Sequence, residues 1–183
     1  MSIKLVSTGG GSVTIQEPNT ASDFTLSVPA ATANILTNKT AGTVLQVVSA
    51  NYNTYSSTAS TSLVSSGLTV SITPTSASSK ILVIVNPLLA VLRNSGTGMA
   101  SLQIVRGATS IYSAERTLAI DTGSFMSSNI SITVLDSPAT TSSTTYTLNY
   151  ACGSAGTGGV RLNDYNSTSP TIGSTITLME IAA

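Results

Sequence analysis

Hydrophobic and polar residues alternate with a period of two along most of the chain. Val13 and Ile15 are separated by polar residues, and the same alternation recurs over 24–28, 68–72 and 130–134. Successive side chains of a β-strand point to opposite faces, so this pattern predicts half-buried strands. No segment combines sustained helical spacing with helix caps, and we therefore expect almost no helix.

The second part of the chain contains a series of such strands separated by Gly, Pro, Asn and Ser clusters. Short strands at this spacing predict an antiparallel β-sandwich or a jelly-roll-like domain, and thus an all-β fold. The expected strands lie near residues 43–50, 67–73, 80–92, 100–106, 109–115, 125–135, 144–152, 159–163 and 174–182.

The segment 81–85, with the sequence ILVIV, is apolar at consecutive positions. A strand that is apolar on both faces is covered on both faces. We therefore expect a central strand, or a strand between the core and another subunit. Pro87 lacks a backbone donor and predicts a bend, a bulge or an edge at this point.

The first 41 residues supply only two short amphipathic strands, on either side of residues 17–20. An isolated two-stranded hairpin is marginally stable in water, so this part must bury its apolar face on something else. We expect an N-terminal β arm over residues 1–41, which anchors or trimerises the protein, followed by a sandwich domain over 42–183. The apolar residues expected to anchor the arm are Val13, Ile15, Phe24, Leu26 and Val28.

Charge is scarce in this chain: 8% of residues are charged and the formal net charge is zero. Ordinary domains carry about 25% charged residues. The 31 serines and 29 threonines provide much of the polarity instead. Domains with a net charge near zero tend to associate, and association would also cover open strand edges. We expect an obligate oligomer.

The chain has no histidine. This excludes Ser-His-Asp and Cys-His nucleophile pairs as well as zinc sites that contain histidine, and we expect no enzyme, no cofactor and no metal centre. Without a basic cluster we expect neither nucleic acid nor membrane as a partner. Cys152 shares the face of alternating Tyr146, Leu148 and Tyr150, which indicates packing in the core.

Seven carboxylates are scattered without a spacing signature, mostly beside turn-forming residues. Two of them could act as a glycosidase pair, for which Asp121 and Asp164 are the candidates to test. Structural roles in turns are favoured instead. Glu180 shares a face with Ile176 and Leu178, so it is either buried with a partner, such as Arg93, Arg106 or Arg116, or exposed by a change of register.

Asn163, Asp164, Tyr165 and Asn166 form a polar cluster that is our candidate receptor loop. Its oxygen atoms could hold Ca²⁺ or contact sugar hydroxyls, with Tyr165 as a stacking face. The cluster does not fit the spacing of a calcium loop, and ordinary turn chemistry is favoured. The glycine-rich stretch 153–159 lacks the Lys-Ser/Thr ending of a phosphate-binding loop, so we expect a hairpin loop.

Several segments resemble bacteriophage virion structural proteins of the tail-fibre and head-decoration type. In the first part of the chain these are 10–15 (GGSVTI), 17–22 (EPNTAS) and 24–29 (FTLSVP). In the second part the similar segments are 67–74, 78–83, 136–138 with 144–146, and 174–183. Each segment is a short β pattern, and together they span nearly the whole chain.

The resemblance implies a homotrimer on the virion surface, with a short β arm and a sandwich knob. Its partners would be other copies of the chain and capsid or tail components. As an alternative function, it implies the receptor-binding tip of a tail fibre, with loops such as 94–99 and 153–169 contacting a host surface glycan or protein. The N-terminus lacks the apolar stretch of a signal peptide, so we expect synthesis in the host cytoplasm.

Overall fold

The computed structural model describes residues 2–6, 8–16, 41–154, 157–164 and 173–183. The chain divides into two compact units, Met1–Ile35 and Leu36–Ala183. The boundary expected between residues 41 and 42 lies near this division and stays a prediction, because residues 17–40 lie outside the described part.

The first unit contains one antiparallel hairpin, formed by β1 (Ser2–Val6) and β2 (Ser12–Gln16). The alternation at Val13 and Ile15 correctly indicated the strand β2, whereas its partner β1 was not predicted. Gly10, with a φ of 84°, lies in the turn between the two strands, where a left-handed backbone favours glycine. Phe24, Leu26 and Val28 lie outside the described residues.

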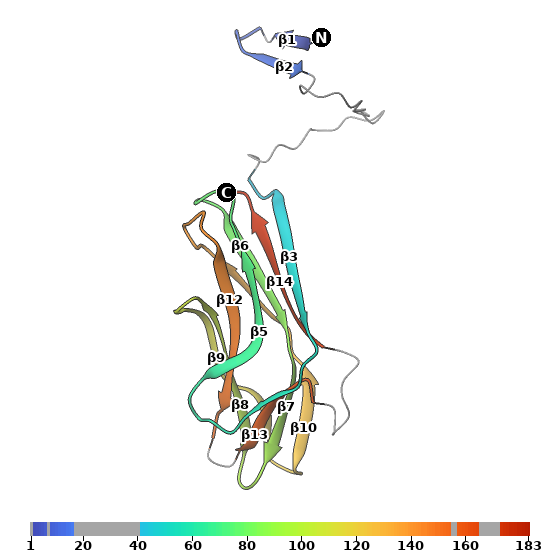
Figure 1. Ribbon diagram of the computed structural model, residues 1–183, viewed down its shortest axis with the longest axis vertical. Coiled ribbons are helices and arrows are strands. Elements are labelled where there is room, and N and C mark those ends of the chain that lie inside the picture. Colours follow the sequence, from blue (N-terminus) through green and yellow to red (C-terminus); the bar gives the residue numbers. More distant parts are fainter. Residues whose placement is uncertain (1, 7, 17–40, 155–156, 165–172) are drawn as a thin grey trace. The chain divides into compact units, whose positions relative to one another are not determined.

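The second unit is built from antiparallel strands, and no helix occurs in the described residues (Figure 1). Both observations confirm the all-β prediction. The strands are β3 (Val44–Tyr52), β4 (Ser56–Thr58), β5 (Val64–Ile72), β6 (Lys80–Asn86), β7 (Leu88–Arg93), β8 (Gly98–Arg106), β9 (Thr109–Ile120), β10 (Phe125–Asn129), β11 (Ile132–Asp136), β12 (Thr144–Cys152), β13 (Thr157–Leu162) and β14 (Ser174–Ile181).

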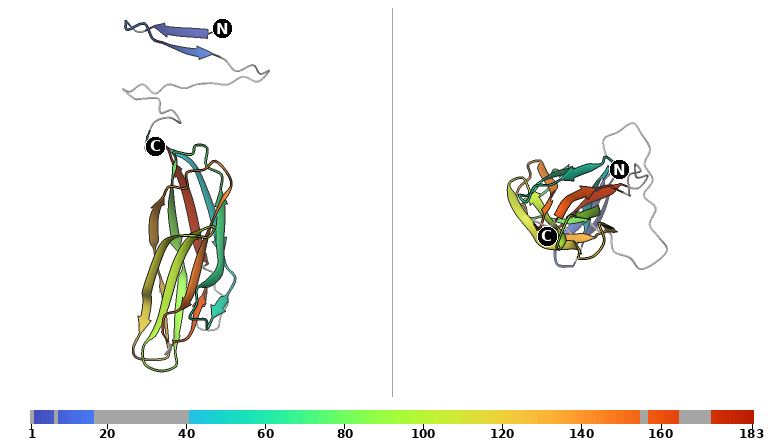
Figure 2. Two further views of the ribbon diagram at one scale, coloured as in Figure 1. Left: turned by 90° about the vertical axis from the view of Figure 1, so that its left-hand side faces the viewer. Right: turned by 90° about the horizontal axis from the view of Figure 1, so that it is seen from below.

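These strands form two layers around one core (Figures 1 and 2). One layer, the unbroken layer, has the order β5-β12-β8-β9. The other, the split layer, consists of two four-stranded halves, β11-β6-β14-β3 and β10-β7-β13-β4. Each strand of the first half is adjacent in chain order to the strand at the same place in the second half, so the halves form four columns with a break across the middle.

Pro87 lies at this break, between β6 and β7. It donates no backbone hydrogen bond, so the ladder cannot pass through it unchanged. Its carbonyl oxygen instead accepts a hydrogen bond from the Ile130 amide, which lies in the gap between β10 and β11. The expectation of a bend or bulge at Pro87 is confirmed. The prediction of one strand over 125–135 is wrong, because the break of the split layer divides this segment into β10 and β11.

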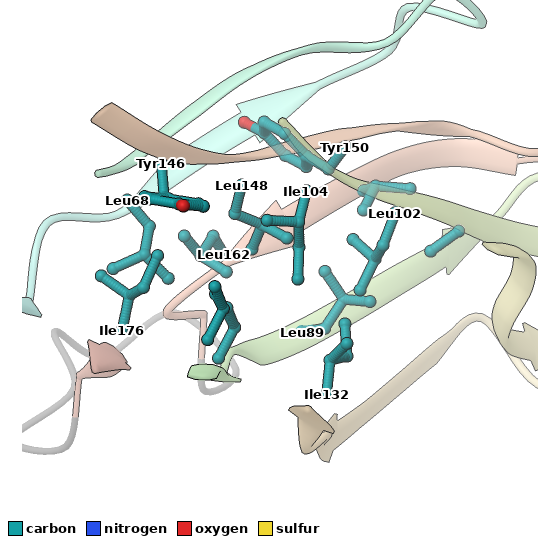
Figure 3. Packing of buried hydrophobic residues seen from close by; sticks show 14 of the residues in the cluster. Leu68, Leu89, Leu102, Ile104, Ile132, Tyr146, Leu148, Tyr150, Leu162 and Ile176 are labelled. Atoms are coloured by element: carbon teal, nitrogen blue, oxygen red, sulfur yellow. The ribbon is translucent and has the colours of Figure 1, made fainter. Parts of the chain in front are cut away.

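The core lies between the layers and consists of inward-facing aliphatic and tyrosine side chains from both (Figure 3). Leu68, Ile104 and Leu148 from the unbroken layer face Leu89, Leu162 and Ile176 from the split layer. Tyr146 and Tyr150 are almost completely buried at its margin. Cys152 is buried in the same cluster, as its place on the tyrosine face predicted.

Numbered in chain order, the columns are β3 with β4 (1), β5 (2), β6 with β7 (3), β8 (4), β9 (5), β10 with β11 (6), β12 (7) and β13 with β14 (8). The split layer then has the column order 1-8-3-6, and the unbroken layer has the order 2-7-4-5. Columns 4 and 5 are the hairpin β8–β9, and the pairs 3–6, 2–7 and 1–8 are nested outside it. This pairing brings the beginning and the end of the second unit together. Gly42 N donates to Ala182 O at 2.8 Å, and Ala182 N donates to Thr43 O at 2.9 Å.

Candidate functional site

Three loops gather at the end of the sandwich opposite residues 41–43 (Figure 1). They are 94–97, 121–124 and residues 153–154 after β12, and hydrogen bonds to backbone groups join them. Arg93 N donates to Ser124 O at 3.0 Å, and its guanidinium donates to the carbonyls of Gly96 and Gly123. The Ser154 hydroxyl donates to Thr97 O. This set, which we call the distal loops, is therefore a connected surface rather than separate hairpin ends.

Asn163 does not lie on a receptor-facing surface. It is fully buried, with a φ of 59°, at the break of the split layer. Its side-chain amide donates to the carbonyls of Tyr52 (2.7 Å) and Thr54 (2.9 Å), and its oxygen accepts from the amide and hydroxyl of Ser174. Its own backbone amide donates to Leu88 O. Asn163 thus joins three columns where strand pairing is interrupted.

Asp164 is also buried, with 3% of its surface exposed. Its carboxylate lies 2.6 Å from the guanidinium of Arg161 on β13, which itself lies 6.0 Å from the centre of the Tyr55 ring. The candidate receptor loop is thus only partly tested. Asn163 and Asp164 turn inward, which makes them structural, whereas Tyr165 and Asn166 lie outside the described residues.

Glu180 is completely buried on β14, which confirms one of the two alternatives for this residue. Its partners are neutral: Thr75 donates from its amide (2.7 Å) and its hydroxyl (2.8 Å), and the Gln46 side chain donates at 2.6 Å. Burial alone would raise the pKa of Glu180, but the hydrogen bonds from Gln46 and Thr75 lower it below the ordinary value.

The three arginines considered as partners of Glu180 bind elsewhere. Arg93 holds the distal loops, and Arg116 donates to the sulfur of Met99. Arg106 lies 3.3 Å from the carboxylate of Asp136, which also accepts a hydrogen bond from the Tyr146 hydroxyl at 2.7 Å. Burial and this carboxylate raise the pKa of Tyr146, so its hydroxyl stays protonated. The cluster connects the two layers.

The remaining candidates show no reactive arrangement in the described residues. No three side chains of the His, Cys, Asp and Glu types gather there as a metal site would require. Burial raises the pKa of the Cys152 thiol, which makes it less nucleophilic. Of the two glycosidase candidates, Asp121 is exposed, whereas Asp164 is buried against Arg161.

The inward turn of residues 163 and 164 was missed because four consecutive polar residues indicate a solvated loop. Burial of Asn163 depends on Tyr52, Thr54 and Ser174, which are distant in sequence. A local signal was present, since asparagine tolerates the left-handed conformation that Asn163 adopts.

Comparison with known proteins assigns no family to the chain. No family model matches it, and no curated protein matches it with significance. Among the described residues there is no helix of sufficient length and apolarity to cross a membrane.

Proposed function

We propose that this protein is a non-enzymatic structural protein of a bacteriophage virion, a homotrimeric surface spike, fibre or capsid-decoration protein. Within it, residues 1–41 form the β arm that attaches the protein or joins its copies, and residues 42–183 form a jelly-roll knob. The arm residues Val13, Ile15, Phe24, Leu26 and Val28 would make the attachment.

The observation that carries this proposal is the nested strand order, with the pairs 1–8 and 3–6 in one layer and 2–7 and 4–5 in the other. An eight-column sandwich with this nesting has the order of a jelly roll, an architecture common in viral capsid domains. The fold alone does not define the function. The resemblance of the segments over 10–29 and 67–83 to phage virion proteins supplies the second line of support.

The position of the chain ends supports an attached knob. Gly42 and Thr43 are hydrogen-bonded to Ala182 at one end of the sandwich, and the distal loops lie at the other (Figure 1). A segment that precedes residue 41 therefore joins the sandwich at the end away from the distal loops. Anchoring through residues 1–41 would leave these loops free.

The test is incorporation into particles. Purified virions should contain the full chain, detected by mass spectrometry and by antibody labelling, and a chain lacking residues 1–41 should fail to incorporate. Circular dichroism of the truncated chain would show whether its sandwich still folds. Absence of the full chain from virions would contradict the virion role, and normal incorporation of a folded truncated chain would contradict anchoring by the arm.

The alternative function, the receptor-binding tip of a tail fibre, is favoured by the connected distal loops. Soluble full-length protein would then compete with phage for adsorption to host cells. In that case substitutions at exposed positions of the distal loops, such as Ser95 and Asp121, would reduce the competition, and a protein without any competing effect would exclude this alternative.

A further inference from the structure

The outer side of the first half of the split layer carries a group of apolar side chains outside the core. On β6 the core side chains are Ile81, Val83 and Val85, so Leu82 and Ile84 between them face outward. On β14 the core residues Ile176 and Leu178 alternate with Met179, which faces outward in the same way. These outward residues do not belong to the core cluster.

Four of the outward residues form a row across all four strands. Leu135 on β11 lies opposite Leu82, Leu82 lies opposite Met179, and Met179 lies opposite Val47 on β3. Leu135 and Val47 are both 55% exposed. Directly opposed side chains in antiparallel strands lie close enough to touch, so the row is a continuous apolar strip. With the neighbouring apolar positions we call it the apolar face: Val44, Val47, Leu82, Ile84, Leu135, Met179 and Ile181.

The outer side of the unbroken layer has the opposite character. There Thr69 and Thr147 are joined by a hydroxyl hydrogen bond of 3.0 Å, and Ser71 and Thr145 by one of 2.7 Å. The side chains of Asn149 and Gln103 are joined at 3.2 Å. Antiparallel sheets that face water on one side carry polar residues there. The unbroken layer follows this rule and the apolar face does not, which indicates that the apolar face is covered.

The charges around the apolar face favour a neutral partner. Lys80 is the charged residue among the outward positions of the described strands β3, β6, β11 and β14, and the others are apolar, Ser, Thr or Asn. No carboxylate at these positions opposes Lys80, so the face offers a charged ligand little complementarity. A second copy of this chain, with a net charge of zero and the same apolar strip, matches it.

The apolar half of the split layer sets the size of the contact. Four columns at about 4.8 Å spacing are about 19 Å wide, and the 7 residues of β6 at about 3.3 Å each are about 23 Å long. The outer side of this half thus has a projected area of about 440 Å², about half of the ~800 Å² that each partner contributes to a standard interface. The apolar face would be the dry centre, and residues around it would supply the rest of the contact.

We propose that copies of this chain associate through the apolar face. This inference rests on the proposed function in requiring an oligomer, but it derives the surface from the sheet itself and needs no contribution from the arm. It also accounts for the strand 81–85, which is apolar on both sides because one side faces the core and the other faces a second copy.

The test compares two lysine substitutions in the full chain. Met179→Lys places a positive charge at the centre of the apolar face, where its neighbours across the strands, Leu82 and Val47, offer no carboxylate to pair with it. Val105→Lys is the matched control, because Val105 lies opposite Thr147 on the outer side of the unbroken layer. We expect Met179→Lys to raise the dissociation constant of the oligomer at least about a hundredfold, since an unpaired charge would be buried. Val105→Lys should change it less than about threefold.

Light scattering over a concentration series gives the dissociation constants, and circular dichroism verifies that each variant is folded. Should Met179→Lys fail to fold, the pair Leu82→Thr and Met179→Thr, which keeps residues suited to strands, should dissociate in the same way. Equal dissociation constants for the two lysine variants, or a wild-type protein that is monomeric throughout, would overturn the proposal.

Particle incorporation distinguishes this inference from the proposed function. If the wild-type protein is present in virions but the Met179→Lys variant associates as tightly as the wild type, the apolar face is rejected and the virion role stands. If the wild-type protein is absent from virions but only the Met179→Lys variant dissociates, the apolar face is supported and the virion role is rejected.

Discussion

Glu180 is a buried carboxylate whose charge is stabilised by neutral donors. Gln46 and Thr75 come from β3 and from the loop between β5 and β6, so the carboxylate connects two distant segments to β14. In the unfolded chain a glutamate has a pKa of about 4.3, and in the folded protein the pKa of Glu180 is lower. The folded state therefore gains stability from its charge above about pH 4.3 and loses it as the pH falls through the folded pKa.

Glu180→Gln should lower the free energy of unfolding by about 1–3 kcal/mol at pH 7. The new amide group would point its N–H donors at the donors of Gln46 and Thr75, and it would carry no charge for them to stabilise. The difference between this variant and the wild type should shrink as the pH falls below about 4.3, because the unfolded chain then takes up a proton and the stabilisation by the charge is progressively lost. Urea unfolding at pH 7, 5 and 3 measures both effects. Glu115→Gln, on an exposed glutamate, is the control. A difference that stays constant with pH would contradict the role of the charge.

At the scale of elements, the split layer is interrupted along one line, and Asn163 replaces the missing strand pairing there. Its side chain makes four hydrogen bonds, to Tyr52, Thr54 and twice to Ser174. Loss of these bonds leaves buried carbonyl and amide groups without partners.

Asn163→Gly should therefore lower the free energy of unfolding by about 2–4 kcal/mol. Glycine adopts the φ of 59° without strain, so this substitution isolates the hydrogen bonds from the backbone conformation. Urea denaturation gives the value, and Asn149→Gly, at a partly buried asparagine of β12, controls for loss of an amide from a sheet. A loss no larger than that of the control would show that the hydrogen bonds of Asn163 do not stabilise the break of the split layer.

The strands themselves were largely predictable, because the period of two is a local signal. The bounds expected near 80–92 and 144–152 match β6, β7 and β12 closely. The end of β9 at Ile120 was missed, since Arg116, with a φ of 58°, lies at a bulge that interrupts the alternation. The three residues of β4 carry no periodicity to detect. The roles of Asn163 and Glu180 depend on contacts distant in sequence, which no local pattern contains.

At the scale of the whole molecule, polarity comes from hydroxyl and amide groups rather than from ions. The outer side of the unbroken layer uses its Ser, Thr, Asn and Gln side chains in pairs across the strands. Around the apolar face, the outward positions of β3, β6, β11 and β14 carry one lysine and no opposing carboxylate. Salt screens interactions between exposed charges, and this molecule has few to screen.

Association through the apolar face should therefore be nearly independent of salt. Between 0.05 and 1 M NaCl, the dissociation constant measured by light scattering should change by less than about threefold. Ammonium sulfate, which strengthens apolar burial, should tighten association. A dissociation constant that rises tenfold or more with NaCl would show that ion pairs hold the oligomer together and would contradict an apolar interface.

The hydrogen bonds between residues 42–43 and Ala182 also determine how the sandwich would bear a mechanical load. A pull on the chain before residue 41 enters β3 along its length, while resistance at the distal loops acts on the opposite end. The bonds of β3 to β14 extend from Val44 to Tyr52 and lie across the direction of pull, so they are loaded together in shear rather than opened one after another. Strands loaded in shear must break many bonds at once. A tethered sandwich of this topology would therefore resist detachment of its first strand.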